Sequence, residues 1–152
     1  MRDKCLTKVP LAIELIHSVH GYEAAADFLT CLHSQRRIRF DATLPDRAHA
    51  GLTRTITLGP EAVEGSTLSL AQTLVHEYFH LKHQHPLHKT VSFWSGVATR
   101  TPTMLRFERP AYQSAIDFLE AAKRAHPHLA TEADAEERAI RQVFESTFGV
   151  GL

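Results

Sequence analysis

The chain has 152 residues, of which 43% are hydrophobic and 22% are charged, an ordinary globular balance. This length suits one domain with one core over residues 1–152. The formal net charge is zero, which gives no reason to expect binding to nucleic acid or to an anionic membrane. Cys5 and Cys31 are too few for a disulfide framework, and a single bridge between them stays open.

The N-terminal segment predicts an amphipathic helix rather than a signal peptide. Glu14 and His17 interrupt its short apolar run, and no small-residue cleavage site follows. The apolar stripe, which ends at Gly21, comprises Leu11, Leu15, Ile16 and Val19. A second helical stripe follows and comprises Tyr22, Ala25, Leu29 and Leu32. No stretch approaches the ~20 apolar residues that a helix needs to span a bilayer.

Two segments in the next part of the chain alternate apolar and polar side chains, which predicts strands over residues 38–44 and 52–58. Pro45 ends the first strand, and residues 46–51 predict a turn. The two strands are therefore expected to pair in antiparallel fashion. If the second strand, RTITL, lies at a sheet edge, it would offer that edge to an extended peptide.

The remaining sequence is helical in pattern. Residues 66–84 predict a long helix that is apolar over most of its surface and therefore buried. A shorter helix is expected over residues 87–98 and a loop over residues 99–103. The next helix is expected to begin near Pro110, and four of its side chains are expected to face inward: Tyr112, Ala115, Ile116 and Leu119. The last helix starts at a capping box formed by Thr131 and Asp134, stops at Gly149, and buries Ile140, Val143, Phe144 and Phe148. The predicted class is α+β, mostly helical.

Residues 71–85 read AQTLVHEYFHLKHQH and contain the pattern H-E-x-x-H. Residues four apart share one face of a helix, so His76 and His80 can bind one metal ion between them. Zinc suits two imidazoles and one further protein ligand, with the fourth position left to water. Glu77 lies ~100° further round the helix, where a general base for the metal-bound water belongs. The pattern is typical of zinc metallopeptidases.

Three histidines and one glutamate are candidates for the third ligand. His83 lies close to the face of His80, but three ligands on one straight helix fit a tetrahedron poorly. His85 and His88 lie where the helix is expected to break and remain alternatives. Glu108 is the better candidate, because it shares the inward stripe of the next long helix.

The alternative to a metal site is a purely structural role for His76 and His80. The chain contains 11 histidines, and roughly one shuffled sequence in twenty would contain H-E-x-x-H by chance. His76 and His80 would then be core histidines with ordinary hydrogen-bond partners. The position of the pattern inside a buried helix favours the metal, because polar side chains there need partners.

The segments LVHEYFH and FERPAY resemble a gluzincin metallopeptidase, in which a downstream glutamate completes the zinc site. The wider pattern over residues 52–120 is similar to small metallopeptidase domains at the C-termini of bacterial polymorphic toxins, such as Rhs-type effectors. The resemblance implies a zincin-like fold, with a short antiparallel β-hairpin packed on the H-E-x-x-H helix. It also implies one Zn²⁺ per chain bound by His76, His80 and Glu108, with Glu77 as the base. Pro110 departs from the pattern, because it suits a first helical turn and would leave Glu108 at the helix edge.

The same resemblance implies zinc-dependent hydrolysis of peptide bonds. The substrate would be a peptide or protein, and an immunity or carrier protein would be a further partner. The expected location is the cytoplasm, or delivery as part of a larger effector by a secretion system that needs no signal peptide. The alternative is a non-catalytic module that uses the same residues to hold zinc structurally or to sense a ligand. Glu77 favours the enzyme, because a structural site needs no carboxylate there.

Tyr112 lies one helical turn beyond Glu108 and has two interpretations. It could donate a hydrogen bond to the oxyanion of a tetrahedral intermediate, or it could fill the core. His83, His85 and His88 are either substrate-binding or solvated surface residues, and the pattern favours the surface. The remaining expectations place Trp94 in the core and the pair His126 and His128 in a loop.

Overall fold

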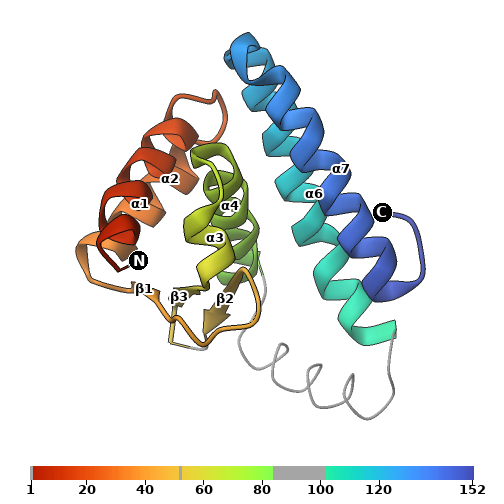
Figure 1. Ribbon diagram of the computed structural model, residues 1–152, viewed down its shortest axis with the longest axis horizontal. Helices are drawn as coiled ribbons and strands as arrows, with labels where there is room; N and C mark the ends of the chain where they lie inside the picture. The colour runs from red at the N-terminus through yellow and green to blue at the C-terminus, as the bar shows by residue number, and fades with distance from the viewer. Residues whose placement is uncertain (1, 52, 84–101) are drawn as a thin grey trace.

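The computed structural model of the protein describes residues 2–51, 53–83 and 102–152 (Figure 1). Its elements in chain order are α1 (Arg2–His17), α2 (Glu23–Ser34), β1 (Ile38–Phe40), β2 (Ala48–Gly51), β3 (Thr55–Leu58), α3 (Pro60–Glu64), α4 (Thr67–His83), α6 (Pro102–Ala125), the 3-10 helix η1 (Pro127–Leu129) and α7 (Ala130–Phe148). The predicted class is confirmed, since the described residues are mostly helical with one small sheet. The helix expected over residues 87–98 lies outside the described residues, as do His85, His88 and Trp94.

Helix α4 lies at the centre of the molecule, as its apolar pattern predicts. Helices α1 and α2 pack on one side of it, α6 packs on another, and β2 also contacts it (Figure 1). Every residue from Leu68 to Val75 is buried, including three polar ones. A helix covered all round has little freedom to shift or rotate, so the side chains that it carries are held in place.

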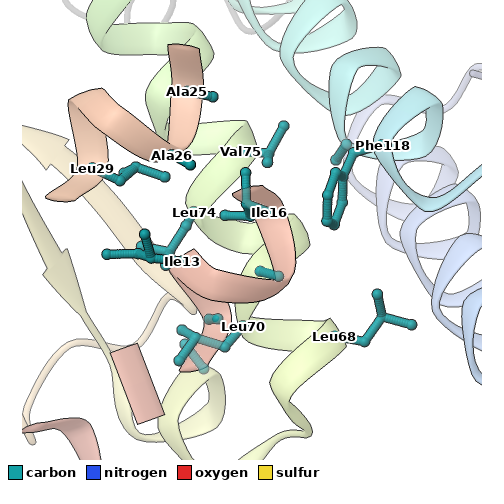
Figure 2. Close-up of a cluster of buried hydrophobic side chains, with 14 of the residues drawn as sticks. Ile13, Ile16, Ala25, Ala26, Leu29, Leu68, Leu70, Leu74, Val75 and Phe118 are labelled. Atoms are coloured by element: carbon teal, nitrogen blue, oxygen red, sulfur yellow. The ribbon is translucent and has the colours of Figure 1, made fainter. Parts of the chain in front are cut away.

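The core joins these helices through side chains at helical spacing. Figure 2 shows Ile13 and Ile16 of α1 and Leu29 of α2 gathered against Leu74 of α4, with Phe118 of α6 reaching in from the other side. Each of these five side chains is buried. Burial of such a side chain contributes about 1.5–3 kcal/mol. The predicted place of Leu11 in this core is wrong, because Leu11 is exposed and Ile13 faces inward instead.

The sheet differs from the predicted antiparallel pair. Its strand order is β1-β3-β2, with β1 parallel to β3 and β2 antiparallel to β3. Residues 48–51, predicted to be part of a turn, form β2, and the strand expected from residue 52 begins at Thr55. The segment RTITL is therefore central rather than an edge, and the predicted β-augmentation at that strand is wrong. Alternation of side chains identifies strands but not their partners, which long-range packing selects.

Parallel pairing of β1 with β3 requires the loop of residues 41–47 to cross from one edge of the sheet to the other. Asp41 donates its backbone N–H to the Leu58 carbonyl at 3.0 Å, and Gly59 donates to the Arg47 carbonyl at 2.8 Å. The loop therefore passes round the end of β3. A side chain at Gly59 would overlap the carbonyl oxygen of Asp46 and would lie 3.1 Å from that of Leu44. Glycine permits this close approach of two backbones.

Helices α6 and α7 form a long antiparallel hairpin beside the rest of the molecule (Figure 1). The predicted start of α6 near Pro110 is wrong, because the helix begins at Pro102 and contains Pro110. The predicted capping box is also wrong. Helix α7 begins at Ala130 without a side-chain cap, and Asp134 instead bonds Lys123 at 2.8 Å. Ile140 and Phe144 are buried as expected, whereas Val143 is exposed.

Candidate metal centre

His76 and His80 lie one turn apart on α4, as the four-residue spacing predicts. Their Nε2 atoms are 3.0 Å apart, the distance of a hydrogen bond between the two imidazoles, and their ring centroids are 4.7 Å apart. This contact also fits the alternative of two core histidines. The side chain of His80 is 3% exposed and that of His76 is 15% exposed. Both imidazoles are therefore largely removed from water, and each needs a polar partner within the protein.

Glu108 of α6 provides that partner for both histidines. Its Oε2 atom lies 3.5 Å from Nε2 of His76 and 3.4 Å from Nε2 of His80. The early start of α6 places Glu108 in the second helical turn, so the expected position at the helix edge is wrong. The packing of α6 against α4 keeps the helix intact despite Pro110, and this packing aims the carboxylate at the histidines.

The spacing of these three donor atoms can be compared with that around a zinc ion. Donors about 2.0–2.2 Å from a tetrahedral ion lie roughly 3.3–3.6 Å from one another. The two contacts of Glu108, at 3.5 and 3.4 Å, fall in that range, and the histidine pair at 3.0 Å is slightly closer. Two imidazoles and one carboxylate are also a donor set that zinc accepts in catalytic sites. The donor chemistry and the two contacts of Glu108 fit a zinc ion, whereas the two histidines would have to move slightly apart to share it.

The charge state of Glu108 follows from the same contacts. Burial alone would raise the pKa of its carboxyl, but contacts with the imidazoles of His76 and His80 outweigh burial. They hold the pKa of Glu108 well below its usual range. The carboxyl is therefore an anion at neutral pH, which is the form that binds a metal.

Glu77 follows His76 on α4, and its side chain is turned into the protein. The residue is only 5% exposed. Its Oε2 atom is buried, and no group in the described part of the chain forms a hydrogen bond with it. Leaving a buried carboxylate oxygen without a partner is costly, and such atoms occur at catalytic sites and at sites of unseen ions or waters.

Tyr112 lies one turn beyond Glu108, as predicted, and contacts the site directly. Its ring packs edge-on against His76 at 4.8 Å and against Phe144 at 5.2 Å. Burial raises the pKa of Tyr112 to about 12, with further contributions from the negative charges of Glu108 and Glu77. The phenol therefore keeps its proton at neutral pH and can donate it in a hydrogen bond. The contacts fit both predicted interpretations, because the same ring fills the core and borders the site.

Arg47, which no sequence pattern singled out, lies in the segment interpreted as a turn. The side chain donates a hydrogen bond to Oγ of Ser69 on α4. It also lies 3.6 Å from Glu136 of α7 and 3.4 Å from Glu61 of α3. The charge of Arg47 acts on the pKa of Tyr112, so this arginine belongs to the surroundings of the site. No periodic pattern marks it, because it follows Pro45 in an irregular loop.

The other histidines singled out from the sequence lie elsewhere. His83 is exposed at the end of α4, where its ring packs on Phe79 at 4.8 Å, in agreement with the surface interpretation. His126 lies between two helices and bonds Ser18, while His128 is part of η1 rather than a loop. Within the described residues, only His76, His80 and Glu108 form a group of three or more donors suited to a metal. Cys31 is an exposed free thiol, so the bridge left open by the sequence does not form.

Comparisons with known proteins do not extend this description. No protein-family model, curated protein or solved structure matches the chain. None of the helices in the described ranges is both long and apolar enough to cross a membrane. The chemistry of the site is therefore argued from its own residues.

Proposed function

We propose that the protein is a zinc-dependent hydrolase of peptide bonds with a gluzincin-like site. One observation carries the proposal. Two histidines of α4 and a glutamate of α6 converge at spacings near those around a zinc ion. Next to His76 in the sequence lies the buried Glu77, whose Oε2 has no hydrogen-bond partner among the described residues. His76, His80 and Glu108 would hold the ion, and Glu77 would act next to it. The packing of β2 against α4 supports the zincin-like part of the proposal.

A zinc ion held there would supply Lewis acidity, making a water molecule acidic near neutral pH and polarising a substrate carbonyl. The carboxylate of Glu77 removes a proton from the attacking water as the oxygen adds to the carbonyl carbon. Tyr112 donates its phenolic proton in a hydrogen bond to the oxyanion that develops on the substrate. Glu77 then delivers its proton to the leaving amine as the C–N bond breaks. Water and the peptide yield one carboxylic acid and one amine.

The similarity of residues 52–120 to toxin metallopeptidase domains makes an effector that cleaves a target protein the specific form of this proposal. An immunity or carrier protein would then be its partner. A non-catalytic zinc module is the competing function. The buried position of Glu77 favours hydrolysis over that alternative, because a purely structural site would leave this carboxylate without a role.

Two measurements on the purified chain test the proposal. Metal analysis should give about one zinc ion per chain, since the described donors form one site. A peptide library should be cleaved by the zinc form, spared after chelation, and cleaved again when zinc is restored. A chain that takes up no zinc would overturn the proposal, and zinc uptake without any cleavage would favour the structural module.

A further inference from the structure

The candidate site is assembled from two bodies rather than from one element. His76, His80 and Glu77 belong to α4, whereas Glu108 and Tyr112 belong to the α6–α7 hairpin, which packs on α4 through the shared core. In Figure 1 this hairpin lies alongside the remainder of the molecule. The donor atoms can reach spacings of 3.4–3.5 Å only when the hairpin sits against α4 in one position. A group that fixes the hairpin therefore controls the geometry of the site.

Arg47 contacts both bodies. Nη2 donates to Ser69 on α4, seven residues and about two turns before His76. Nη1 lies 3.6 Å from Oε2 of Glu136 on α7. The fork of the guanidinium, with its several donors in one plane, suits a bridge between two surfaces.

Burial makes the contact with Glu136 consequential. The side chains of Arg47 and Glu136 are 29% and 21% exposed. Oε2 of Glu136 is buried and has no hydrogen-bond partner among the described residues, so the contact with Arg47 is an ion pair without a hydrogen bond. In the described part of the chain, Arg47 is the cation that faces this oxygen. Removing one partner of a partly buried ion pair leaves the other charge less well compensated, and the structure responds by admitting water or moving apart. Loss of Arg47 would therefore disfavour the docked position of α7, and with it that of α6.

The contact with Glu61 has a different character. Nε of Arg47 lies 3.4 Å from this carboxylate, but the side chain of Glu61 is 70% exposed. Exposed ion pairs are screened by water and contribute little. Among the contacts of Arg47, the bridge from Ser69 to Glu136 is therefore the one that can adjust the position of the hairpin, which apolar packing on α4 holds in place.

We propose that Arg47 is a positioning residue, which bridges α4 and α7 and thereby holds Glu108 at the distance from His76 and His80 that a metal ion requires. The inference rests on the proposed zinc site. It adds a residue that touches neither metal nor substrate and acts through the docking of one helical hairpin.

The test measures metal binding rather than hydrolysis. Arg47→Met keeps an unbranched apolar stem and removes the charge and all donors. Its zinc affinity, measured by competition with a chromophoric chelator, should fall roughly 2- to 30-fold, the range typical of residues that modulate a site through packed contacts. The visible spectrum of the cobalt form should also change, because the arrangement of donors around the ion changes. Arg39→Met, an exposed arginine on β1, is the charge-matched control and should leave both properties unchanged.

A second variant separates positioning from general damage. Adding Glu136→Gln to Arg47→Met removes the uncompensated charge, so part of the lost affinity should return. Parental zinc affinity and an unchanged cobalt spectrum in Arg47→Met would overturn the inference while leaving the zinc site intact. If the parent protein itself binds neither zinc nor cobalt, the proposed function fails first. Should Arg47→Met fail to fold, Glu136→Gln alone should weaken zinc binding, and an unchanged affinity would again overturn the inference.

Discussion

Helix α6 carries an acidic side chain in a polar cluster near each end, and the two clusters lie in opposite surroundings. At one end Glu108 faces His76 and His80 at 3.5 and 3.4 Å, with His80 almost completely buried. At the other end Lys123 lies 2.6 Å from Glu120 and 2.8 Å from Asp134. The carboxylates of that second pair are 38% and 48% exposed. The shorter contacts therefore belong to the more solvated cluster.

The difference shows why distance alone is a poor guide to importance. In the exposed cluster each charge exchanges contact with water for contact with a partner, so little is gained. In the buried cluster the groups are largely removed from water, so their remaining partners determine how well the charges are stabilised. A charge-assisted hydrogen bond between buried partners would close to about 2.7–2.9 Å. The spacing around Glu108 is wider than that and lies in the range expected of ligands that share a zinc ion.

The largest expected effect concerns Glu77, the carboxylate in the buried site without a described partner. Glu77→Gln keeps the shape of the side chain but cannot accept a proton from water. Peptide hydrolysis should fall by about 10²–10⁴-fold, the usual contribution of a general base. Zinc content and the circular dichroism spectrum should match the parent. Near-parental turnover on a peptide that the parent cleaves would show that Glu77 is not the base.

The next effect compares the two ends of α6 directly. Glu108→Gln replaces a ligand oxygen anion by a neutral amide, so zinc affinity should fall by more than the roughly 10–100-fold that loss of an outer-shell partner costs. Glu120→Gln is the matched change at the exposed end and should leave zinc affinity unaltered. Chelator competition measures both. Equal affinities in the two variants would remove Glu108 from the ligand set.

A smaller effect is expected where the loop of residues 41–47 crosses the end of β3. Gly59→Ala would drive a methyl group into the carbonyl oxygen of Asp46, a backbone atom that cannot move cheaply. The free energy of unfolding should fall by about 1–3 kcal/mol, as for other overpacked sites. Urea denaturation measures it, with Gly151→Ala as the control, because a methyl group there meets open space. Unchanged stability in Gly59→Ala would contradict the described crossing of the loop.

The smallest effect belongs to the exposed cluster. Hydrogen bonding to Lys123 lowers the pKa of Glu120, and the same interaction lowers that of Asp134. A carboxyl group whose pKa is lowered by folding stabilises the fold at pH values above its ordinary pKa, which is 4.5 for Glu120. This contribution is lost as the pH falls through the pKa of the folded state. Lys123→Met should therefore lower the free energy of unfolding slightly more at pH 7 than at pH 3. The loss at pH 7 should be smaller in high salt than in low salt. A large loss of stability that does not depend on salt concentration would show that this cluster behaves like the buried one.

Helical periodicity predicted much of what can be compared with the structure. The burial of α4, the shared face of His76 and His80, and the inward stripe of α6 all follow from a period of 3.6 residues, which backbone geometry imposes locally. Element starts were predicted less well. Pro110 and the pair of Thr131 and Asp134 are ordinary start signals, but the packing of α6 and α7 extends both helices beyond them.

Strand pairing and the docking of helices do not follow from helical periodicity. The alternation in residues 38–44 and 52–58 is compatible with either strand direction, and the short segment Ala48–Gly51 carries no clear signal of its own. The close approach of Gly59 to Asp46 makes the crossing loop possible, and only the folded chain brings these residues together. The spacing of residues thus set which side chains share a helix face. The docking of the hairpin on α4 decided that Glu108 meets the two histidines and that Arg47 bridges the two bodies, because long-range contacts depend on how whole surfaces fit.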